Sequence, residues 1–365
     1  MLFSMPQTAM VIHPFTIPHV QLTNSRPGSF TYSKTFGSQS LEPAPEDRKP
    51  LSKDAVMWMA SCTKLMTAIS VMQLVERGVL SLDKPVYDLV PELKDFQILQ
   101  GFNEAGSANQ VPNNTPITLR RLLTHTSGLS YHEMSPLLMQ WNQSLGKDHT
   151  KESDLLARFT APLIFEPGTS WMYGTGLDFA GLVIERATKK SLEEYMKENL
   201  WGPLGITDIT FFLDKRPDMK AKQMGLGVRD AETGKTAYAA HAHAYRELNG
   251  MEIRDCMGGQ GSLGNASSYI KVLHAVLTAD EDEKLLKKES VDELFRPQLN
   301  EAGKAAFNGM MQIQMVRNAM GLPPADIEKD YGLGGAVIMG DEEGGRREGT
   351  LIWAGLPNIS WVSAL

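Results

Sequence analysis

Ser61 and Lys64 stand three residues apart at the start of a strongly apolar run, and this stretch constrains the chain more than any other. Apolar residues continue at helical spacing as far as Val75, and Gly78 follows. The pattern predicts a helix that is buried on most sides. It also predicts that the helix stops at Gly78, because glycine is the usual residue just past a helix C-terminus.

The spacing of the serine and the lysine indicates a chemical pair. On a helix, positions three apart share a face, with Cβ atoms roughly 5–6 Å apart, so the Ser61 hydroxyl and the Lys64 ammonium can meet. A serine is a poor nucleophile until a neighbouring base takes its proton. Burial and the positive end of a helix can make a lysine that base, as in the S-x-x-K pattern of penicillin-recognising serine enzymes. The alternative is a serine near a helix start and a solvated lysine.

The composition excludes several classes of function. The chain has 365 residues and a formal net charge of −7, so nucleic acid is not an expected partner. Two cysteines imply no disulfide framework and fit a reducing compartment. No apolar run approaches the roughly 20 residues that span a bilayer, and residues 1–15 lack the features of a signal peptide. We therefore expect a soluble, cytoplasmic protein with no membrane partner.

Neither a dinucleotide site nor a metal site is favoured by the remaining motifs. The stretch Gly259-Gln-Gly261-Ser-Leu-Gly264 matches G-x-G-x-x-G, but no buried strand precedes it and no βαβ unit surrounds it. His241-Ala-His243 would need further ligands nearby to bind a metal ion, and two histidines in a loop are the preferred interpretation. We expect neither a cofactor nor a metal ion.

Two further stretches have residues suited to chemistry, each with a structural alternative. Trp171 to Thr175 follows the turn Pro167-Gly168. A tyrosine at such a junction, Tyr173, can project into a cleft and move protons near a lysine, but from this stretch alone a packing aromatic is the preferred interpretation. The small residues of Trp353-Ala-Gly355 let a ligand approach the backbone of a strand closely, and a hairpin turn is the alternative there.

The order of these motifs carries a resemblance to a known family. It runs from Ser61-x-x-Lys64 through Leu122-Leu-Thr-His-Thr-Ser-Gly-Leu129, Pro167-Gly-Thr with Tyr173 and Gly258-Gly-Gln-Gly261 to Trp353-Ala-Gly355. This order is similar to that of class C β-lactamase-type serine hydrolases. Longer matching stretches, one reaching Tyr131 and another spanning Leu177-Asp-Phe-Ala-Gly181, resemble the fungal lovastatin-type acyltransferases more closely. The resemblance extends from Phe30 to Trp361, which is most of the chain.

The resemblance implies an α/β (α+β) fold of the β-lactamase and transpeptidase type, with an antiparallel sheet flanked by helices and a mainly helical lobe. Residues 1–365 then form a single catalytic domain. Its α/β part comprises residues 30–85 and 255–365, its helical lobe comprises residues 86–254, and residues 1–29 are irregular.

The resemblance also implies one more strand and a final helix beyond Leu365. That strand would lie in the middle of the sheet, so we expect unpaired inner edges and low stability without it. Met10-Val-Ile12 can offer a substitute, but Pro14 and Pro18 limit the strand length available there.

The resemblance assigns roles to individual residues. Ser61 is the acylated nucleophile, and Lys64 and Tyr173 are its acid and base partners. Trp353, Ala354 and Gly355 replace the Lys-Thr-Gly strand of β-lactamases. The backbone N–H groups of Ser61 and Leu356 form the oxyanion hole.

The implied reaction moves a short acyl group from a thioester to an alcohol of a secondary metabolite. The expected partners are a small-molecule acceptor and an acyl-carrier domain of a polyketide synthase, and the expected state is a monomer. Two alternatives stay open: an esterase or β-lactamase-like hydrolase with the same residues, and an inactive binding protein.

Overall fold

The computed structural model describes residues 8–12, 19–23, 32–146, 148, 152–230, 233–239, 253–279, 281–356 and 359–364. Its α-helices are α1 (Thr63–Glu76), α2 (Leu119–Leu123), α3 (Pro136–Ser144), α4 (Leu155–Phe159), α5 (Gly176–Thr188), α6 (Leu192–Met196), α7 (Pro217–Lys220), α8 (Ala266–Leu277), α9 (Lys288–Phe295), α10 (Glu301–Met310) and α11 (Gln314–Ala319). Its strands are β1 (Thr8–Ile12), β2 (His19–Thr23), β3 (Tyr32–Thr35), β4 (Met57–Trp58), β5 (Ile98–Phe102), β6 (Ala108–Val111), β7 (Gly227–Arg229), β8 (Thr236–Tyr238), β9 (Leu263–Gly264), β10 (Lys329–Tyr331), β11 (Ala336–Ile338), β12 (Leu351–Gly355) and β13 (Ile359–Ser363).

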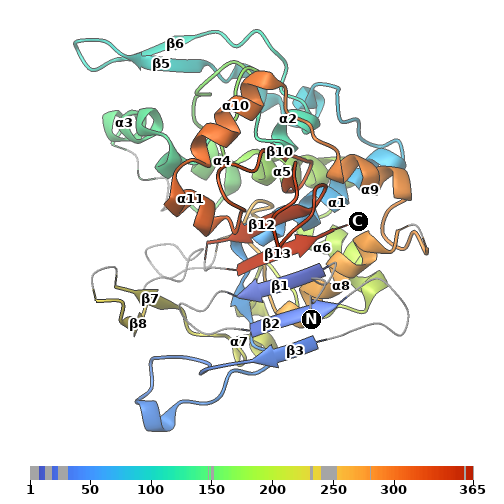
Figure 1. Ribbon diagram of the computed structural model, residues 1–365. Helices are drawn as coiled ribbons and strands as arrows, with labels where there is room; N and C mark the ends of the chain where they lie inside the picture. Colours follow the sequence, from blue (N-terminus) through green and yellow to red (C-terminus); the bar gives the residue numbers. More distant parts are fainter. Residues whose placement is uncertain are drawn as a thin grey trace.

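A seven-stranded antiparallel sheet combines strands from both ends of the chain. Its order is β10-β11-β12-β13-β1-β2-β3, so the last strand of the chain lies beside the first (Figure 1). Helix α8 packs against β1 and β2. Helices α2 to α7 and the hairpins β5–β6 and β7–β8 all belong to the segment between β4 and β9. The expected antiparallel sheet with flanking helices and a mainly helical middle segment is therefore confirmed.

The N-terminal region differs from the sequence prediction. Residues 1–29 are not irregular throughout, because β1 and β2 lie within them. The inner edge of β13 is not left unpaired either, since β1 pairs with it from Thr8↔Ser363 to Ile12↔Ile359 and pairs with β2 on its other side. The prolines do not prevent this pairing. Pro14 and Pro18 fall between the two strands, so both strands keep their backbone donors.

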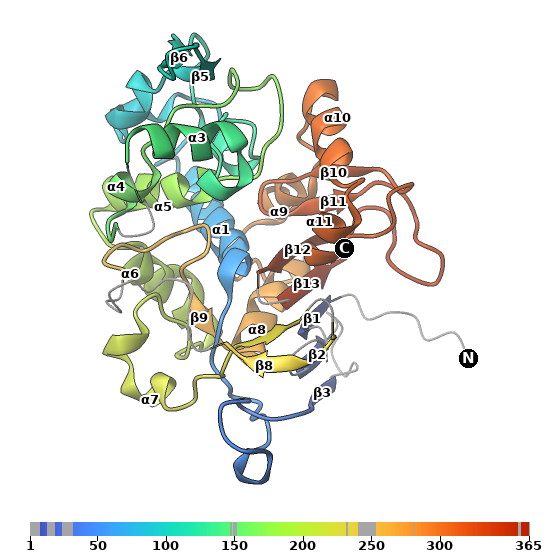
Figure 2. The ribbon, with the colours of Figure 1, turned by 90° about the vertical axis from the view of Figure 1, so that its left-hand side faces the viewer.

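Helix α1 runs through the middle of the molecule. Its residues from Thr63 to Leu74 are all buried, including Lys64 at 0% exposure. It packs against α5, α6 and α9, and Figure 2 shows it between the helices of the middle segment and the sheet. The helix ends at Glu76, and Gly78 follows with a φ of 70° in the left-handed region. Both the burial and the glycine stop agree with the sequence prediction.

The length and the composition of the helices decide whether any of them could cross a membrane. Across the described ranges, every helix is too short or too polar to cross a bilayer.

The pairing of β1 with both its neighbours predicts that the N-terminal strand is essential for stability. A chain that starts after Ile12 would leave the inner edges of β13 and β2 without partners. Each buried group left unpaired costs about 1–3 kcal/mol, against a total stability of about 5–15 kcal/mol. We expect this chain to unfold at much lower urea concentration than the full chain.

A chain that lacks only residues 1–7 is the matched control, because it keeps all of β1. Its urea midpoint of unfolding should be close to that of the full chain. Equal urea midpoints for the two shortened chains would contradict the role assigned to β1.

Candidate active site

Ser61 lies in a strained turn that leads directly into α1. The turn is the 3₁₀ segment η2 (Ala60–Cys62), in which Ala60 has a φ of 45°. A residue with a Cβ pays roughly 1–2 kcal/mol for this left-handed conformation. Thr63 holds the turn, because its hydroxyl donates to the Ala60 carbonyl at 2.6 Å and lies 2.7 Å from the Ser262 hydroxyl. The backbone around Ser61 is therefore fixed, as is common at functional sites.

The Ser61 hydroxyl is contacted by two of the side chains that the sequence singled out. The Tyr173 hydroxyl lies 2.5 Å from Ser61 Oγ, and Lys64 Nζ lies 3.4 Å from it. The Trp353 indole N–H donates to the Tyr173 oxygen at 3.3 Å. The structure thus brings together Ser61 from η2, Lys64 from α1, Tyr173 from the segment before α5, and Trp353 from β12.

The Lys64 ammonium is fully buried and surrounded by acceptors. It donates to the Gly259 carbonyl at 2.7 Å and to the Tyr131 hydroxyl at 3.1 Å, besides its contact with Ser61. It also lies 4.6 Å from the centroid of the Tyr173 ring, within the range of a cation–π interaction. Three donors and three acceptors match, so the ammonium is held in one orientation.

Asp178 organises the other side of this network. Its carboxylate accepts a hydrogen bond from the Tyr131 hydroxyl at 2.9 Å and one from the Gly259 backbone N–H at 2.9 Å. Burial raises the pKa of Asp178, and the nearby Lys64 charge opposes that rise. The carboxyl group therefore orients two of the three groups that accept from the lysine, Tyr131 and Gly259.

A side chain at position 259 would collide with the network around the lysine. A Cβ there would lie 2.4 Å from an Asp178 carboxylate oxygen and 2.7 Å from the Tyr131 hydroxyl. Glycine at position 259 thus lets the backbone carbonyl approach the lysine closely. This requirement gives a physical reason for one glycine of the Gly258-Gly-Gln-Gly261 motif.

Sequence reasoning gave Tyr131 and Asp178 no role of their own, because they appeared only within longer matching stretches. Asp178 did carry a signal. It is a lone carboxylate among the buried residues of α5, at 0% exposure, and buried carboxylates are rare unless they are paired.

The end of β12 lies against the Ser61 turn. Trp353, Ala354 and Gly355 are buried, and a Cβ on Gly355 would lie 2.5 Å from the Met59 carbonyl. Leu356 follows the strand with 77% of its surface exposed. The hairpin alternative also holds, since β12 pairs with β13 from Leu351↔Ser363 to Gly355↔Ile359. A hairpin and a close backbone approach are thus compatible here.

The structure does not test the two histidines that the sequence offered as candidate metal ligands. Within the described ranges, no group of three or more His, Cys, Asp and Glu side chains could hold a metal ion. His241 and His243 lie outside the described residues.

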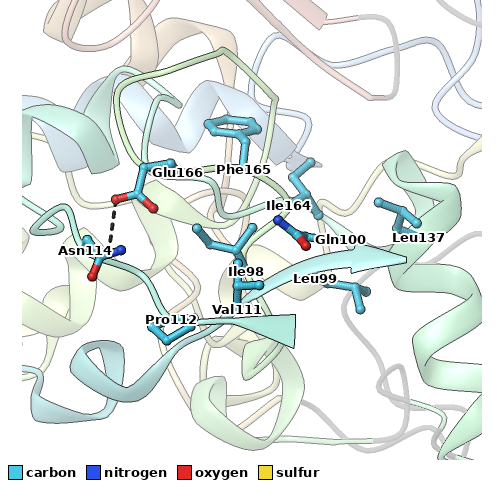
Figure 3. Close-up of a pocket in the computed structure, with 10 residues that line it drawn as sticks. All are labelled: Ile98, Leu99, Gln100, Val111, Pro112, Asn114, Leu137, Ile164, Phe165 and Glu166. Carbon is cyan, nitrogen blue, oxygen red and sulfur yellow. Dashed lines mark hydrogen bonds between the residues drawn. The ribbon is translucent and has the colours of Figure 1, made fainter. Parts of the chain in front are cut away.

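A separate cavity of about 600 Å³ opens beside the β5–β6 hairpin (Figure 3). None of the residues discussed above belongs to its lining. The lining is mainly apolar with three polar side chains, and consists of Ile98, Leu99, Gln100, Val111, Pro112, Asn114, Leu137, Ile164, Phe165 and Glu166.

Comparison with known proteins shows which family the chain belongs to. The sequence pattern of the Beta-lactamase family matches residues 10–326. The chain belongs to the beta-lactamase family. It is 38% identical to monacolin J acid methylbutanoyltransferase from Aspergillus terreus over 337 residues, which cover 92% of this chain and 80% of the relative. It is also 35% identical to lovastatin esterase from Penicillium rubens over 336 residues, which cover 92% of this chain and 82% of that enzyme.

A solved structure agrees with these relatives. The unliganded simvastatin synthase from Aspergillus terreus superimposes with a TM-score of 0.82 at 34% identity, over 98% of this chain and 85% of that protein. The chain is therefore an enzyme of the acyltransferase and esterase group within this family.

The tight fit at position 259 predicts a specific sensitivity. Gly259→Ala places a methyl group against the Asp178 carboxylate and the Tyr131 hydroxyl, and overpacking of this kind costs about 1–3 kcal/mol. We expect a lower melting temperature and a large loss of ester-cleaving activity.

The matched control is Gly309→Ala in α10, where an added Cβ meets nothing within 4 Å. This change should leave stability unchanged or slightly higher, because alanine favours a helical backbone over glycine and position 309 lies near the end of α10. If the two variants behave alike in melting and in activity, position 259 does not have the role described.

Proposed function

We propose that the chain transfers a short acyl group from a thioester to the alcohol of a secondary metabolite, through an acyl-Ser61 intermediate. One observation carries the proposal: Ser61 Oγ is contacted by both Tyr173 and Lys64, and that lysine is held in a fully buried network. A serine hydroxyl beside a matched proton acceptor is the signature of an activated nucleophile.

In the first half of the reaction, Ser61 Oγ attacks the carbonyl carbon of the thioester. Its proton passes to the Tyr173–Lys64 pair, which must begin one proton short of its fully protonated form. The tetrahedral intermediate then expels sulfur, so that the C–S bond breaks and the C–O bond to Ser61 remains. The leaving thiolate takes the proton back from the pair, and the pair is ready for the second half.

The Trp353 indole favours Tyr173 as the group that exchanges this proton. Its N–H donates to the Tyr173 oxygen at 3.3 Å, and the Lys64 ammonium lies over the same ring. Both interactions stabilise negative charge on the phenol oxygen. Tyr173 is thus the proposed acid and base, and Lys64 the group that tunes it.

The oxyanion of each tetrahedral intermediate needs donors of its own. We assign this role to the backbone N–H groups of Ser61 and Leu356. The close approach of Gly355 to the Met59 carbonyl supports this assignment, because it draws the end of β12 toward the Ser61 turn. Donors of this kind are each worth about 3–4 kcal/mol to a transition state. Ala354 and Gly355 are small residues, which lets the end of β12 lie close to the Ser61 turn.

In the second half, the acceptor alcohol replaces the thiol. Its oxygen attacks the acyl carbon, its proton passes to the Tyr173–Lys64 pair, and the C–O bond to Ser61 breaks. Ser61 regains the proton from the pair. Atoms and protons then balance, and the products are a thiol and a new ester.

The relatives suggest the classes of donor and acceptor. One relative is named as the enzyme that transfers a methylbutanoyl group to monacolin J acid. By analogy, we assign a short acyl donor and a small-molecule alcohol acceptor to this chain. We further assign the donor to the acyl-carrier domain of a polyketide synthase, and a monomeric state to the enzyme.

Ester hydrolysis is the second candidate function. It is favoured by the 35% identity to lovastatin esterase over nearly the whole chain. The same residues would serve, with water in place of the acceptor alcohol.

One experiment distinguishes transfer from hydrolysis. The enzyme is incubated with a short branched acyl thioester, with and without added alcohols, while free acid, ester and intact protein mass are followed. The proposal predicts an ester product that grows with alcohol concentration at the expense of free acid. Free acid alone, at every alcohol concentration, would favour the esterase and contradict transfer.

The shared proton relay yields a separate prediction. Tyr173→Phe and Lys64→Ala should each lower kcat on an activated ester by about 100- to 10,000-fold, the usual contribution of general acid–base catalysis. Because the two groups act as one unit, the double variant should be little worse than either single variant.

Tyr195→Phe is the matched control, since Tyr195 is a buried tyrosine whose hydroxyl bonds to Gln73 at 3.3 Å. It should retain kcat, and melting curves should be recorded for every variant. Losses that multiply in the double variant would mean that Lys64 and Tyr173 act independently.

A further inference from the structure

Tyr173 must be held accurately, yet it lies outside regular structure. Residues 170–174 belong to neither a helix nor a strand, and α5 begins only at Gly176. A displacement of about 1 Å at a reacting group can cost a factor of about 100 in rate. The segment that carries Tyr173 therefore needs anchors from elsewhere in the chain.

His125 supplies both backbone anchors around Tyr173. The Met172 N–H donates to the backbone carbonyl of His125 at 3.1 Å. The Gly174 N–H donates to Nδ1 of the His125 imidazole at 3.2 Å. The imidazole and the Tyr173 ring also pack against each other, with centroids 4.8 Å apart. One residue thus holds the peptide groups on both sides of the tyrosine and the ring between them.

The backbone at position 125 is itself in an unusual conformation. His125 has a φ of 59°, in the left-handed region that few residues other than glycine adopt. Its flanking threonines brace it, because the Thr124 and Thr126 hydroxyls lie 2.9 Å apart and the Thr126 carbonyl accepts from the Gly168 N–H at 2.7 Å. Strained residues of this kind persist where the surroundings over-determine them, and they cluster at functional sites.

The protonation state of the imidazole suits this task. Since Nδ1 accepts a peptide N–H, it carries no proton. Burial lowers the pKa of His125 well below its usual value, and the nearby Lys64 charge lowers it further. Within the described residues, Nε2 has no hydrogen-bond partner, and the rings of Trp171 and Tyr331 pack edge-on against the imidazole. The ring is therefore a neutral acceptor that stays neutral beside a buried ammonium.

We propose that His125 is a positioning residue for acyl transfer, which sets the Tyr173 hydroxyl against Ser61 by holding the Met172 and Gly174 N–H groups. The inference deepens the function proposed above and rests on the proton transfer assigned there to Tyr173. His125 contacts neither Ser61 nor the site of the acyl group in this account, so its effect passes through Tyr173.

Two substitutions at position 125 distinguish the effect of the hydrogen-bond acceptor from the effect of the backbone conformation. Asparagine and glycine both tolerate a positive φ. In His125→Asn, the side-chain oxygen takes the place of Nδ1, at the same number of bonds from the backbone, whereas His125→Gly has no acceptor. Phe307→Leu is the matched packing control, because Phe307 lies in the same aromatic cluster, against Trp171 and Tyr331.

Initial rates on an activated ester give kcat and KM for each variant, and melting curves give stability. We expect kcat of His125→Gly to fall by about 10- to 100-fold with KM nearly unchanged. His125→Asn should recover most of that loss. Phe307→Leu should lower the melting temperature while kcat stays within about twofold of the parent. Equal losses in the Asn and Gly variants, or an equal loss in Phe307→Leu, would overturn the positioning role.

The Tyr173→Phe background gives the decisive comparison. If His125 acts through the phenol, His125→Gly should cost little further activity there. A full additional loss would show a role unrelated to Tyr173. Both outcomes are distinct from failure of the proposed function, which would instead appear as an unchanged kcat in Tyr173→Phe alone.

Discussion

The buried ammonium of Lys64 is the constraint on which the rest of the structure depends. An unpaired charge in a protein interior is very unfavourable, so a buried lysine requires acceptors and an opposite charge close by. Gly259, Tyr131 and Asp178 meet that requirement. They come from different parts of the chain, and Tyr131 and Gly259 lie 67 and 195 positions from Lys64. The lysine can be buried only when the whole fold has assembled.

The same requirement links the fold to the reaction. The η2 turn and helix α1 present Ser61 and Lys64, the segment between α1 and β9 contributes Tyr131, Tyr173 and Asp178, and β12 contributes Trp353. The site therefore lies where these three parts of the molecule meet. Because each part supplies a member of the hydrogen-bond network around Ser61, none of them can form the site alone.

Sequence reasoning predicted what depends on short spacing and missed what depends on tertiary contact. Ser61 lies in η2 and Lys64 in the first turn of α1, which follows η2 directly, so a helical spacing of three residues was sufficient to pair them. The local pattern alone favoured a packing role for Tyr173, and only the family resemblance predicted its catalytic role. His125 and Asp178 have partners that no local pattern reveals. The irregular N-terminus was a wrong prediction because a strand of five residues, β1, shows its pairing only once β13 is in place.

The central claim is that Ser61 carries the acyl group. The most direct measurement is to quench the enzyme rapidly with a short acyl thioester, digest it, and locate the added acyl mass by peptide mass spectrometry. The account predicts the adduct on Ser61, formed within the first turnover and absent from Ser61→Ala. An adduct on Cys62 with Ser61 unmodified, or full turnover without any Ser61 adduct, would contradict it.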